Sequence, residues 1–397
     1  MAPLGTRVAR RHRSRYFSRR PRCTRRCEIF RRTLVCLVAL AAILPFVASA
    51  QAAQPYKLGT FAEQGRTFVG VVLGDSLVVD FAAAHATLPT TVGMATVPAD
   101  MKDLIARYEQ GVRNRIQEIV RAVSATASRP AYVHSLGALR TRPPIMYPSN
   151  MINTALNYTE HALEMAGLNS GPPALAAGAP PPGYATATTT SAPGIWEREP
   201  TDGRWNPYMF LKSPSTVIAD GEAVRLPVGR DRIDSECELG AVIGRTASRV
   251  PLERANDYIF GYTIELDVSD RGGRGDERYG SDWLIAKSHD TFGPLGPFIV
   301  PKEFVSDPRN LSVRYVINGA LFQEANTSLM IHDVFEQVVY ATNILTLQPG
   351  DVIATGSPAG VGSARNPPVF LEPGDLSVCT YEGIGTLTNP IVGATGQ

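Results

Sequence analysis

The chain has 397 residues, 44% of them hydrophobic, which is enough for one large domain and a smaller one. Its net charge of +2 is unevenly distributed. Residues 1–32 hold twelve arginines and one acid, and removing this excess of +11 leaves about −9 for the rest of the chain. A mildly acidic body excludes a broad basic surface for nucleic acid.

Residues 1–53 have the order of a secretory leader. The arginine-rich start is followed by a short apolar run at 34–44 and then by small residues that offer cleavage after Ala50 or Ala53. The apolar run is too short for a comfortable membrane span. We therefore expect an exported protein, periplasmic or secreted, with no membrane attachment after cleavage. An organellar transit peptide and a misassigned start are the alternatives.

Cysteine usage changes sharply after the leader. Three of the five cysteines lie within it, and only Cys237 and Cys379 remain beyond residue 53. A disulfide framework is therefore excluded, while one bridge is possible but cannot be predicted from the sequence. Cys237 is expected to be a small buried residue rather than a nucleophile.

Residues 55–148 are predicted to form a small α+β domain. Apolar and polar residues alternate around glycine turns at 55–100, and Asp75 lies at a turn between two strand-like runs, which predicts a hairpin. Helical spacing of apolar residues then predicts one long amphipathic helix at 100–127. Prolines at 143–148 mark the passage to a second domain at 150–393.

A short helix is predicted at 157–166, with Asn157 as its cap and Glu160 completing a capping box. His161 and Glu164 are three residues apart and share one face of it. A surface His–Glu pair is the alternative interpretation. The following residues, 167–206, are low in complexity and form an insert that we expect to lengthen a lid over the site.

The acidic pair Glu236 and Glu238 lies in a strand-like run, so both side chains point to the same face and Cys237 points to the other. Two like charges this close resist burial unless a cation joins them. Asp267, in a second strand-like run, adds a third carboxylate. An oxygen-only set predicts a hard divalent cation, Mg²⁺ first and then Mn²⁺ or Ca²⁺. Solvated acids on an exposed strand are the alternative.

Several ordered motifs from residue 150 onward resemble the fumarylacetoacetate hydrolase family, and in particular its acylpyruvate hydrolases. They are Asn-Tyr-x-x-His-x-x-Glu at 157–164, Phe-Leu-Lys-x-Pro-Ser at 210–215, Asp-x-Glu-x-Glu-Leu at 234–239, Gly-Tyr-Thr at 261–263, Asp-Val-Ser at 267–269, Lys-Ser-His-Asp-Thr-Phe at 287–292 and Thr-Gly-Ser-Pro-Ala-Gly-Val-Gly at 355–362. Motifs in this order are far more specific than any one of them. One departure is the segment after Ser269, where the glutamine often seen in the family is missing and Arg271 remains.

The resemblance implies an α+β fold that is mainly β, a mixed β-sandwich roll preceded by the small N-terminal domain, usually as a homodimer. It also implies a short β-dicarbonyl or related keto acid as the substrate. Glu236, Glu238 and Asp267 would then hold the metal, and residues at matching motif positions would contact the substrate. These are Lys212, Arg271, Thr355 and Gly356, with Lys287 in a catalytic role. Lys212 could alternatively be a surface lysine, and Thr355 and Gly356 could merely turn the chain.

The expected activity is hydrolysis of a carbon–carbon bond in an acylpyruvate. In this hypothesis His161, oriented by Glu164, deprotonates a water molecule, and the departing enolate is stabilised by the metal and Lys287. A keto-acid decarboxylase or isomerase is the alternative among enzymes, because the same enolate serves these reactions. An exported, non-catalytic dicarboxylate-binding protein is the alternative from another class.

Overall fold

The two strands predicted to carry the metal ligands are the longest in the described part of the chain. In the computed structural model, β10 (Ile233–Ile243) and β11 (Ile259–Asp270) pair antiparallel along their length, and every residue of both is buried. The structure describes residues 54–93, 96–126, 128–166, 192–197, 199, 201–204, 206–273 and 282–394. The leader prediction for residues 1–53 and most of the predicted insert lie outside this range.

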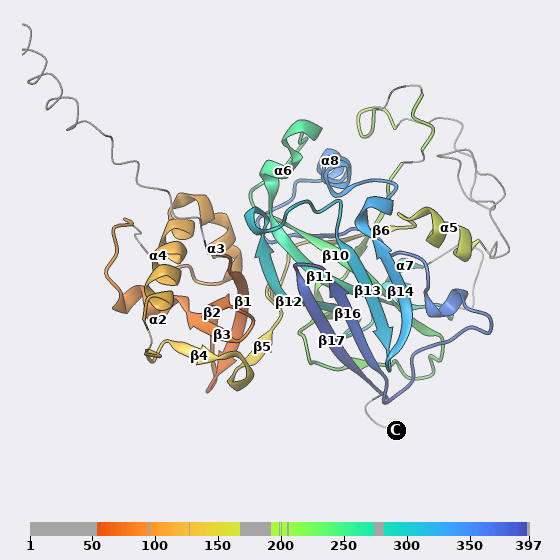
Figure 1. Cartoon of the computed structure of the whole chain (residues 1–397). Coiled ribbons are helices and arrows are strands. Elements are labelled where there is room, and N and C mark those ends of the chain that lie inside the picture. The colour runs from red at the N-terminus through yellow and green to blue at the C-terminus, as the bar shows by residue number, and fades with distance from the viewer. Residues whose placement is uncertain are drawn as a thin grey trace, which may run out of the picture. The chain divides into compact units, whose positions relative to one another are not determined.

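Around β10 and β11 the described strands form a large mixed sheet, visible across the centre of Figure 1. Its path runs β4-β3-β2-β1-β12-β11-β10-β15-β6-β7, with β5 paired to β1 and β8 to β12. The bounds of the remaining strands are β1 (Lys57–Glu63), β2 (Arg66–Leu73), β3 (Leu77–Asp80), β4 (Val133–Ser135), β5 (Arg140–Arg142), β6 (Met151–Ala155), β7 (Tyr208–Lys212), β8 (Val217–Ile218), β12 (Gly293–Pro301) and β15 (Val352–Ala354).

A second described sheet covers the apolar face of β10 and β11. Its order is β14-β13-β16-β17-β9, with bounds β9 (Val224–Arg225), β13 (Ser312–Ile317), β14 (Ala320–Asn326), β16 (Leu376–Tyr381) and β17 (Gly385–Val392). Alternate residues of the long strands, such as Leu239 and Leu266, pack in one core cluster with Val313 and Leu387 of this sheet. Packing of two sheets through alternate side chains defines a β-sandwich. The predicted fold class, α+β and mainly β, is therefore confirmed.

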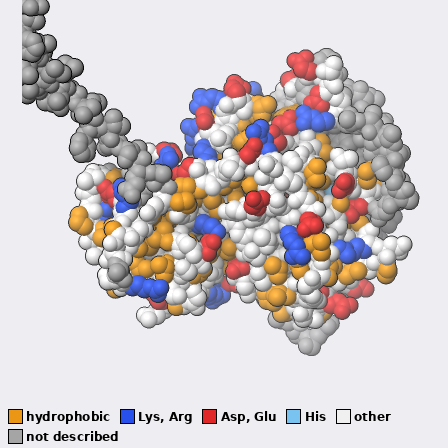
Figure 2. All heavy atoms as spheres, in the orientation of Figure 1, with side chains coloured by type: hydrophobic (Ala, Val, Ile, Leu, Met, Phe, Trp, Pro, Cys, Tyr) orange, Lys and Arg blue, Asp and Glu red, His pale blue; other side chains and the backbone are white. Residues whose placement is uncertain are grey.

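The described helices pack against the sheets, and buried side chains of those between residues 81 and 124 share a core cluster with the N-terminal strands. The helices are α2 (Phe81–Thr87), α3 (Met101–Ala106), α4 (Val112–Ser124), α5 (Thr159–Met165), α6 (Ala255–Tyr258), α7 (Trp283–Lys287) and α8 (Val334–Ile344). None of the helices in the described part of the chain is both long and apolar enough to cross a membrane. On the face drawn in Figure 2, basic and acidic side chains are interspersed.

The N-terminal strands extend the same large sheet, because β1 pairs with β12 through Leu58 and Ile299. The predicted hairpin is present: β2 and β3 pair antiparallel around a turn in which Asp75 has a φ of 51°. The single long helix predicted at 100–127 is wrong. The chain forms α3 and α4 instead, separated at Gly111, whose φ of 111° is incompatible with a continuous helix. The helical spacing of apolar residues continues across Gly111, so the sequence pattern did not indicate that the helix is interrupted there.

The described end of the predicted insert is attached to α8. Trp196 is buried, with its ring edge-on to His332 and Tyr340 at 5.8 and 5.9 Å between ring centroids. Arg204 forms an ion pair with Glu336 at 2.8 Å. Glu336 also closes the capping box of α8, accepting a hydrogen bond from the backbone N–H of Asp333.

Gly261 sets the spacing between β11 and β12, and its replacement tests this packing. A Cβ at this position would lie 2.3 Å from the carbonyl oxygen of Val300. We expect Gly261→Ala to lower the free energy of unfolding by about 2 kcal/mol or more, because a backbone atom cannot yield as a flexible side chain would. Chemical denaturation measures this. Gly137→Ala, where a Cβ meets nothing within 4 Å, is the matched control; equal loss in both variants would contradict the argument.

Glu336 should make stability depend on acid pH. Burial alone would raise its pKa, but hydrogen bonds from His332 and Arg204 lower the pKa of Glu336 to about 2. Because the folded-state pKa lies below the ordinary value of 4.5, the stabilisation is complete above pH 4.5 and is lost as pH falls towards 2. We expect Glu336→Gln to lower the melting temperature at pH 7 and to flatten its decline in acid. Glu253→Gln, at an exposed site, should leave the wild-type pH profile intact.

Candidate active site

The three predicted metal ligands converge. Glu236 on β10 lies directly opposite Asp267 on β11, and Glu238 follows two residues along the same face. One carboxylate oxygen from each lies within 4.8 Å of the others, and the residues are 4%, 2% and 1% exposed for Glu236, Glu238 and Asp267. Burial this deep rules out the alternative of solvated acids on an exposed strand. Antiparallel pairing of two strands therefore assembles the cluster without help from loops.

A fourth carboxylate, Glu265, belongs to the same face and was missed in the sequence. It lies opposite Glu238 on the neighbouring strand and is fully buried. Its Oε2 accepts a hydrogen bond from the Asn153 side chain at 3.1 Å, and Lys212 Nζ lies 3.5 Å from its Oε1. The signal was available, because Glu265 and Asp267 have the same two-residue spacing as Glu236 and Glu238. Burial raises the pKa of Glu265 to about 8.

Three cations surround these acids, as the family motifs implied. Lys287 Nζ donates to Glu236 at 2.6 Å and also to Asp267, and its ammonium lies 5.2 Å from the centre of the Phe210 ring. Lys212 donates to Asp267 and is completely buried, which rules out the surface-lysine alternative. Arg271 Nη2 lies 2.7 Å from Glu236. Paired charges of this kind make burial of the carboxylates tolerable.

His161 and Glu164 form the predicted pair on α5. His161 Nδ1 and Glu164 Oε1 are 2.7 Å apart, and His161 Nε2 lies 3.3 Å from Glu236, so the imidazole connects the pair to the carboxylate cluster. Backbone N–H groups of Gly360 and Val361 donate to Glu164. His161 is buried, which rules out a surface pair. Burial would lower the pKa of His161, but the two neighbouring glutamates raise it.

The helix that carries His161 begins differently from the prediction. Its cap residue is Tyr158, without a side-chain capping bond, and the predicted capping box at Asn157 is wrong. The Asn157 amide instead donates to the carbonyl oxygens of His332 and Thr355, and its oxygen accepts from the His332 N–H. Asn157, which the sequence pattern assigned to the start of its own helix, therefore binds backbone groups about 175 to 198 residues away.

Thr355 and Gly356 lie at the edge of the cluster. The Gly356 N–H donates to Glu238 Oε2 at 2.8 Å, and its φ of 94° brings the backbone close to Asn157. The Thr355 hydroxyl is buried without a hydrogen-bond partner in the described part of the chain. Gly356 therefore fixes the side chain of a predicted metal ligand. The Thr355 hydroxyl is a buried polar group available to a ligand of the site.

The donor set fits a hard divalent cation. Burial, together with the negative charges of Asp267, Glu265 and Glu236, raises the pKa of Glu238 well above its ordinary value. For Glu236, burial has the same tendency, but Arg271, Lys287 and His161 hold the pKa well below its usual range. Among the residues that the structure describes, Glu238 has no cationic partner like those of Glu236, and a dication between the carboxylates would supply one. Oxygen-only ligands favour Mg²⁺, Mn²⁺ or Ca²⁺ over softer metals.

A β-sandwich that presents a buried carboxylate triad beside a His–Glu pair agrees with the family resemblance implied by the motifs. Residues 150–392 match the model of the fumarylacetoacetate (FAA) hydrolase C-terminal domain. The chain therefore belongs to this family, and the family resemblance inferred from the motifs is confirmed.

Two relatives with similar sequences are oxaloacetate tautomerases. The chain is 32% identical over 337 residues to the oxaloacetate tautomerase YisK of Bacillus subtilis, covering 84% of this chain and 99% of that protein. It is 40% identical over 186 residues to the mitochondrial oxaloacetate tautomerase fahd2 of Xenopus laevis, a match that spans 47% of this chain and only 58% of the frog protein.

A solved structure with similar architecture is the maleylpyruvate hydrolase of Sphingobium sp. SYK-6 in complex with manganese(II) and pyruvate. The TM-score is 0.59 at 28% identity, and the comparison covers 85% of this chain and 100% of that chain. Hydrolases and tautomerases therefore share the fold and the family of this protein.

Glu238→Gln should separate metal binding from folding. We expect Mn²⁺ to raise the melting temperature of the wild-type chain but not that of the variant, because one of three anionic ligands is lost. In EDTA the variant should melt no lower than wild type, since it removes a carboxylate that its neighbours repel. Glu324→Gln, on an exposed position of β14, is the control and should keep the full Mn²⁺ response. An undiminished response in Glu238→Gln would exclude the residue as a ligand.

Proposed function

We propose that the protein is a metal-dependent hydrolase that cleaves a carbon–carbon bond in an acylpyruvate or a related β-dicarbonyl acid. The observation that carries the proposal is the position of His161 between Glu164 and the carboxylate cluster, at 2.7 and 3.3 Å. A histidine held by a carboxylate on one nitrogen can act as a general base through the other. Hydrolysis needs such a base for water, whereas decarboxylation does not.

In this proposal the triad of Glu236, Glu238 and Asp267 holds Mg²⁺ or Mn²⁺. A divalent cation there supplies Lewis acidity towards the oxygens of a 2-oxo acid. His161 Nε2 takes a proton from water, and Glu164 keeps the imidazole oriented through Nδ1. Attack of the hydroxide on the distal carbonyl breaks the carbon–carbon bond and releases a carboxylic acid and the enolate of pyruvate, which takes up a proton.

The cations of the site have a second role in this proposal. Lys287 lies beside the cluster and offsets the negative charge that develops on the departing enolate. Lys212 and Arg271 contribute positive charge that favours an anionic substrate over a neutral ketone. Both are also anchored on the carboxylates, so their positions are fixed before a substrate arrives.

Oxaloacetate tautomerisation is the second candidate, favoured by the match over 99% of the length of the Bacillus subtilis tautomerase. That reaction moves a proton between carbon and oxygen without breaking a carbon–carbon bond. The same histidine serves it as the proton carrier, so geometry alone supports both reactions.

A substrate panel distinguishes these reactions. The full chain with Mn²⁺ is offered acylpyruvates, fumarylacetoacetate and oxaloacetate, while enol absorbance, pyruvate and CO₂ are followed. Pyruvate from an acylpyruvate supports the hydrolase, and enol loss from oxaloacetate without pyruvate or CO₂ supports the tautomerase. CO₂ release identifies a decarboxylase. Mn²⁺ binding without any turnover would favour the non-catalytic binding protein.

His161→Ala should lower turnover by about a thousandfold, because general-base catalysis contributes on the order of 10² to 10⁴. Mn²⁺ affinity should stay within a few-fold of wild type, since His161 is not among the predicted ligands. Manganese titration and steady-state kinetics measure the two effects. His134→Ala, a histidine of β4 in the N-terminal region, is the matched control. Near-normal turnover of His161→Ala would contradict the role of the residue as the base.

We also propose that the protein is a homodimer, on the strength of the family resemblance. Sedimentation equilibrium of the full chain tests this, and a monomer over the micromolar range would contradict it.

A further inference from the structure

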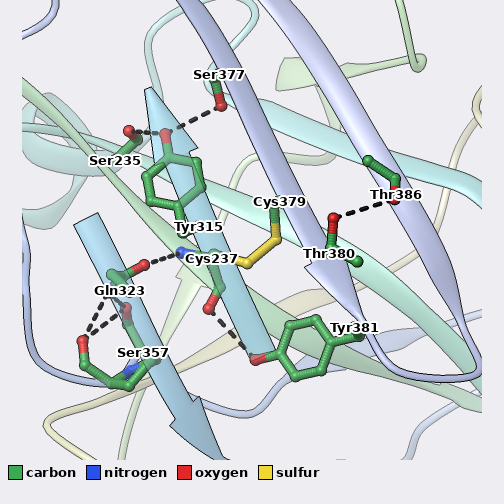
Figure 3. The surroundings of a disulfide bond; sticks show 11 residues. Ser235, Cys237, Tyr315, Gln323, Ser357, Ser377, Cys379, Thr380, Tyr381 and Thr386 are labelled. Carbon is green, nitrogen blue, oxygen red and sulfur yellow. Dashed lines mark hydrogen bonds between the residues drawn. A yellow bond between two sulfur atoms is a disulfide. The ribbon is translucent and has the colours of Figure 1, made fainter. Parts of the chain in front are cut away.

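A disulfide bond joins Cys237 and Cys379 at the centre of the β-sandwich (Figure 3). The bond connects residues 142 positions apart in the sequence, with their Cα atoms 5.7 Å apart. Cys237 belongs to β10 and Cys379 to β16, so the bond runs from one sheet to the other. Both residues are completely buried. The sequence left this bridge open, and the nucleophile interpretation of Cys237 is excluded by its pairing.

The position of Cys237 gives the bond its significance. It lies between Glu236 and Glu238, and side chains alternate along a strand. The two carboxylates therefore point into the site from one face of β10. The Cys237 side chain lies on the opposite face and points towards β16. The covalent link is thus one residue away from each of two predicted metal ligands.

Side chains of the second sheet also hold the Cys237 peptide by hydrogen bonds. Its N–H donates to Gln323 Oε1 at 3.0 Å, and its carbonyl oxygen accepts from the Tyr381 hydroxyl at 3.3 Å. Gln323 Nε2 donates to Ser357 Oγ and to the Pro358 carbonyl oxygen, both at 2.6 Å (Figure 3). Gln323 therefore ties the ligand strand to the 355–362 segment, which also holds Glu238 and Glu164 through its backbone.

A strand in this position needs such support. Like charges on adjacent positions of β10 and β11 repel one another, and the repulsion tends to separate the strands or to shift one along the other. A covalent bond resists both movements, because it fixes the distance of Cys237 from the second sheet. The bond therefore adds to the ion pairs and hydrogen bonds of this strand a restraint that does not depend on charge.

We propose that the Cys237–Cys379 bond is a positioning element of the metal site, and that the protein reaches its full metal affinity only after thiol oxidation. The inference rests on the proposed metal site. Formation of the bond removes two electrons and two protons from the two thiols, and both pass to a disulfide of a dithiol–disulfide exchange protein, which becomes a dithiol. Such oxidants act in secretory and periplasmic compartments, whereas the cytosol keeps thiols reduced.

This requirement agrees with the predicted export of the chain. The two cysteines beyond the predicted leader are the two that pair with each other. An exported chain of this composition carries no third thiol that could compete for the bond. The predicted leader and the disulfide independently favour the same oxidising compartment.

The test compares Mn²⁺ affinity with and without the bond in the full chain. Peptide mapping after alkylation of free thiols should first find Cys237 linked to Cys379 in wild-type protein from an oxidising host. We then expect Cys379→Ala and Cys237→Ala each to weaken Mn²⁺ binding about tenfold, measured by the electron paramagnetic resonance of free Mn²⁺. The double variant should lose no more than either single variant, because all three remove the same bond. Thr380→Ala, one residue along β16, should bind as wild type.

A merely structural bond would give a different result: melting temperatures would fall, but folded variants would keep wild-type Mn²⁺ affinity, and the proposal would be overturned. Free thiols at both positions in the wild-type protein would also overturn it. If the alanine variants do not fold, wild-type protein reduced until both thiols alkylate replaces them. Tenfold weaker binding restored by reoxidation supports the proposal, and unchanged affinity opposes it. A wild-type chain that binds no Mn²⁺ would instead refute the metal site itself.

Discussion

The arrangement of this protein depends on burying like charges on two paired strands. Glu236, Glu238, Glu265 and Asp267 form a compact array inside the large sheet, where ionised carboxylates are costly unless they are matched. Neighbouring groups lower this free-energy cost of burial. Lysine and arginine side chains pair with three of the acids, the backbone N–H of Gly356 donates to the fourth, and the oxygen-only centre suits a divalent cation. The need to neutralise these buried carboxylates therefore explains why the neighbouring strands, helices and loops place cations and N–H donors at the site.

Register makes the array possible. A slip of one residue between β10 and β11 would turn the acids into the apolar core and place residues such as Leu239 and Leu266 in the site. Both faces thus resist a slip, one through ion pairs and the other through packing and the cystine. The close approach of β11 to β12 at Gly261 adds a third restraint, since it leaves no space for a side chain there.

Local sequence patterns predicted the parts of this site that lie on single elements. Two-residue spacing predicted Glu236 and Glu238 on one face of a strand, and three-residue spacing predicted His161 and Glu164 on one face of a helix. The features that the sequence did not predict depend on contacts between distant residues or on backbone geometry. Asn157 binds His332 rather than its own helix, Gly111 breaks a helix whose apolar spacing continues, and the partner of Cys237 lies 142 residues away. Glu265 is different, because the same spacing rule that identified Glu236 and Glu238 also applied to it.

The 355–362 segment explains how one site serves a family that includes hydrolases and tautomerases. Gly356 donates to Glu238 and Gly360 donates to Glu164, both from backbone with positive φ, so a single turn fixes the base relative to the carboxylates. In the proposed function, the backbone thereby places the proton carrier next to a bound 2-oxo acid. Tautomerisation and bond cleavage would then differ in whether a water molecule reaches the distal carbonyl. That choice depends on groups that do not hold the carboxylates, and those groups can change without disturbing the base or the metal site.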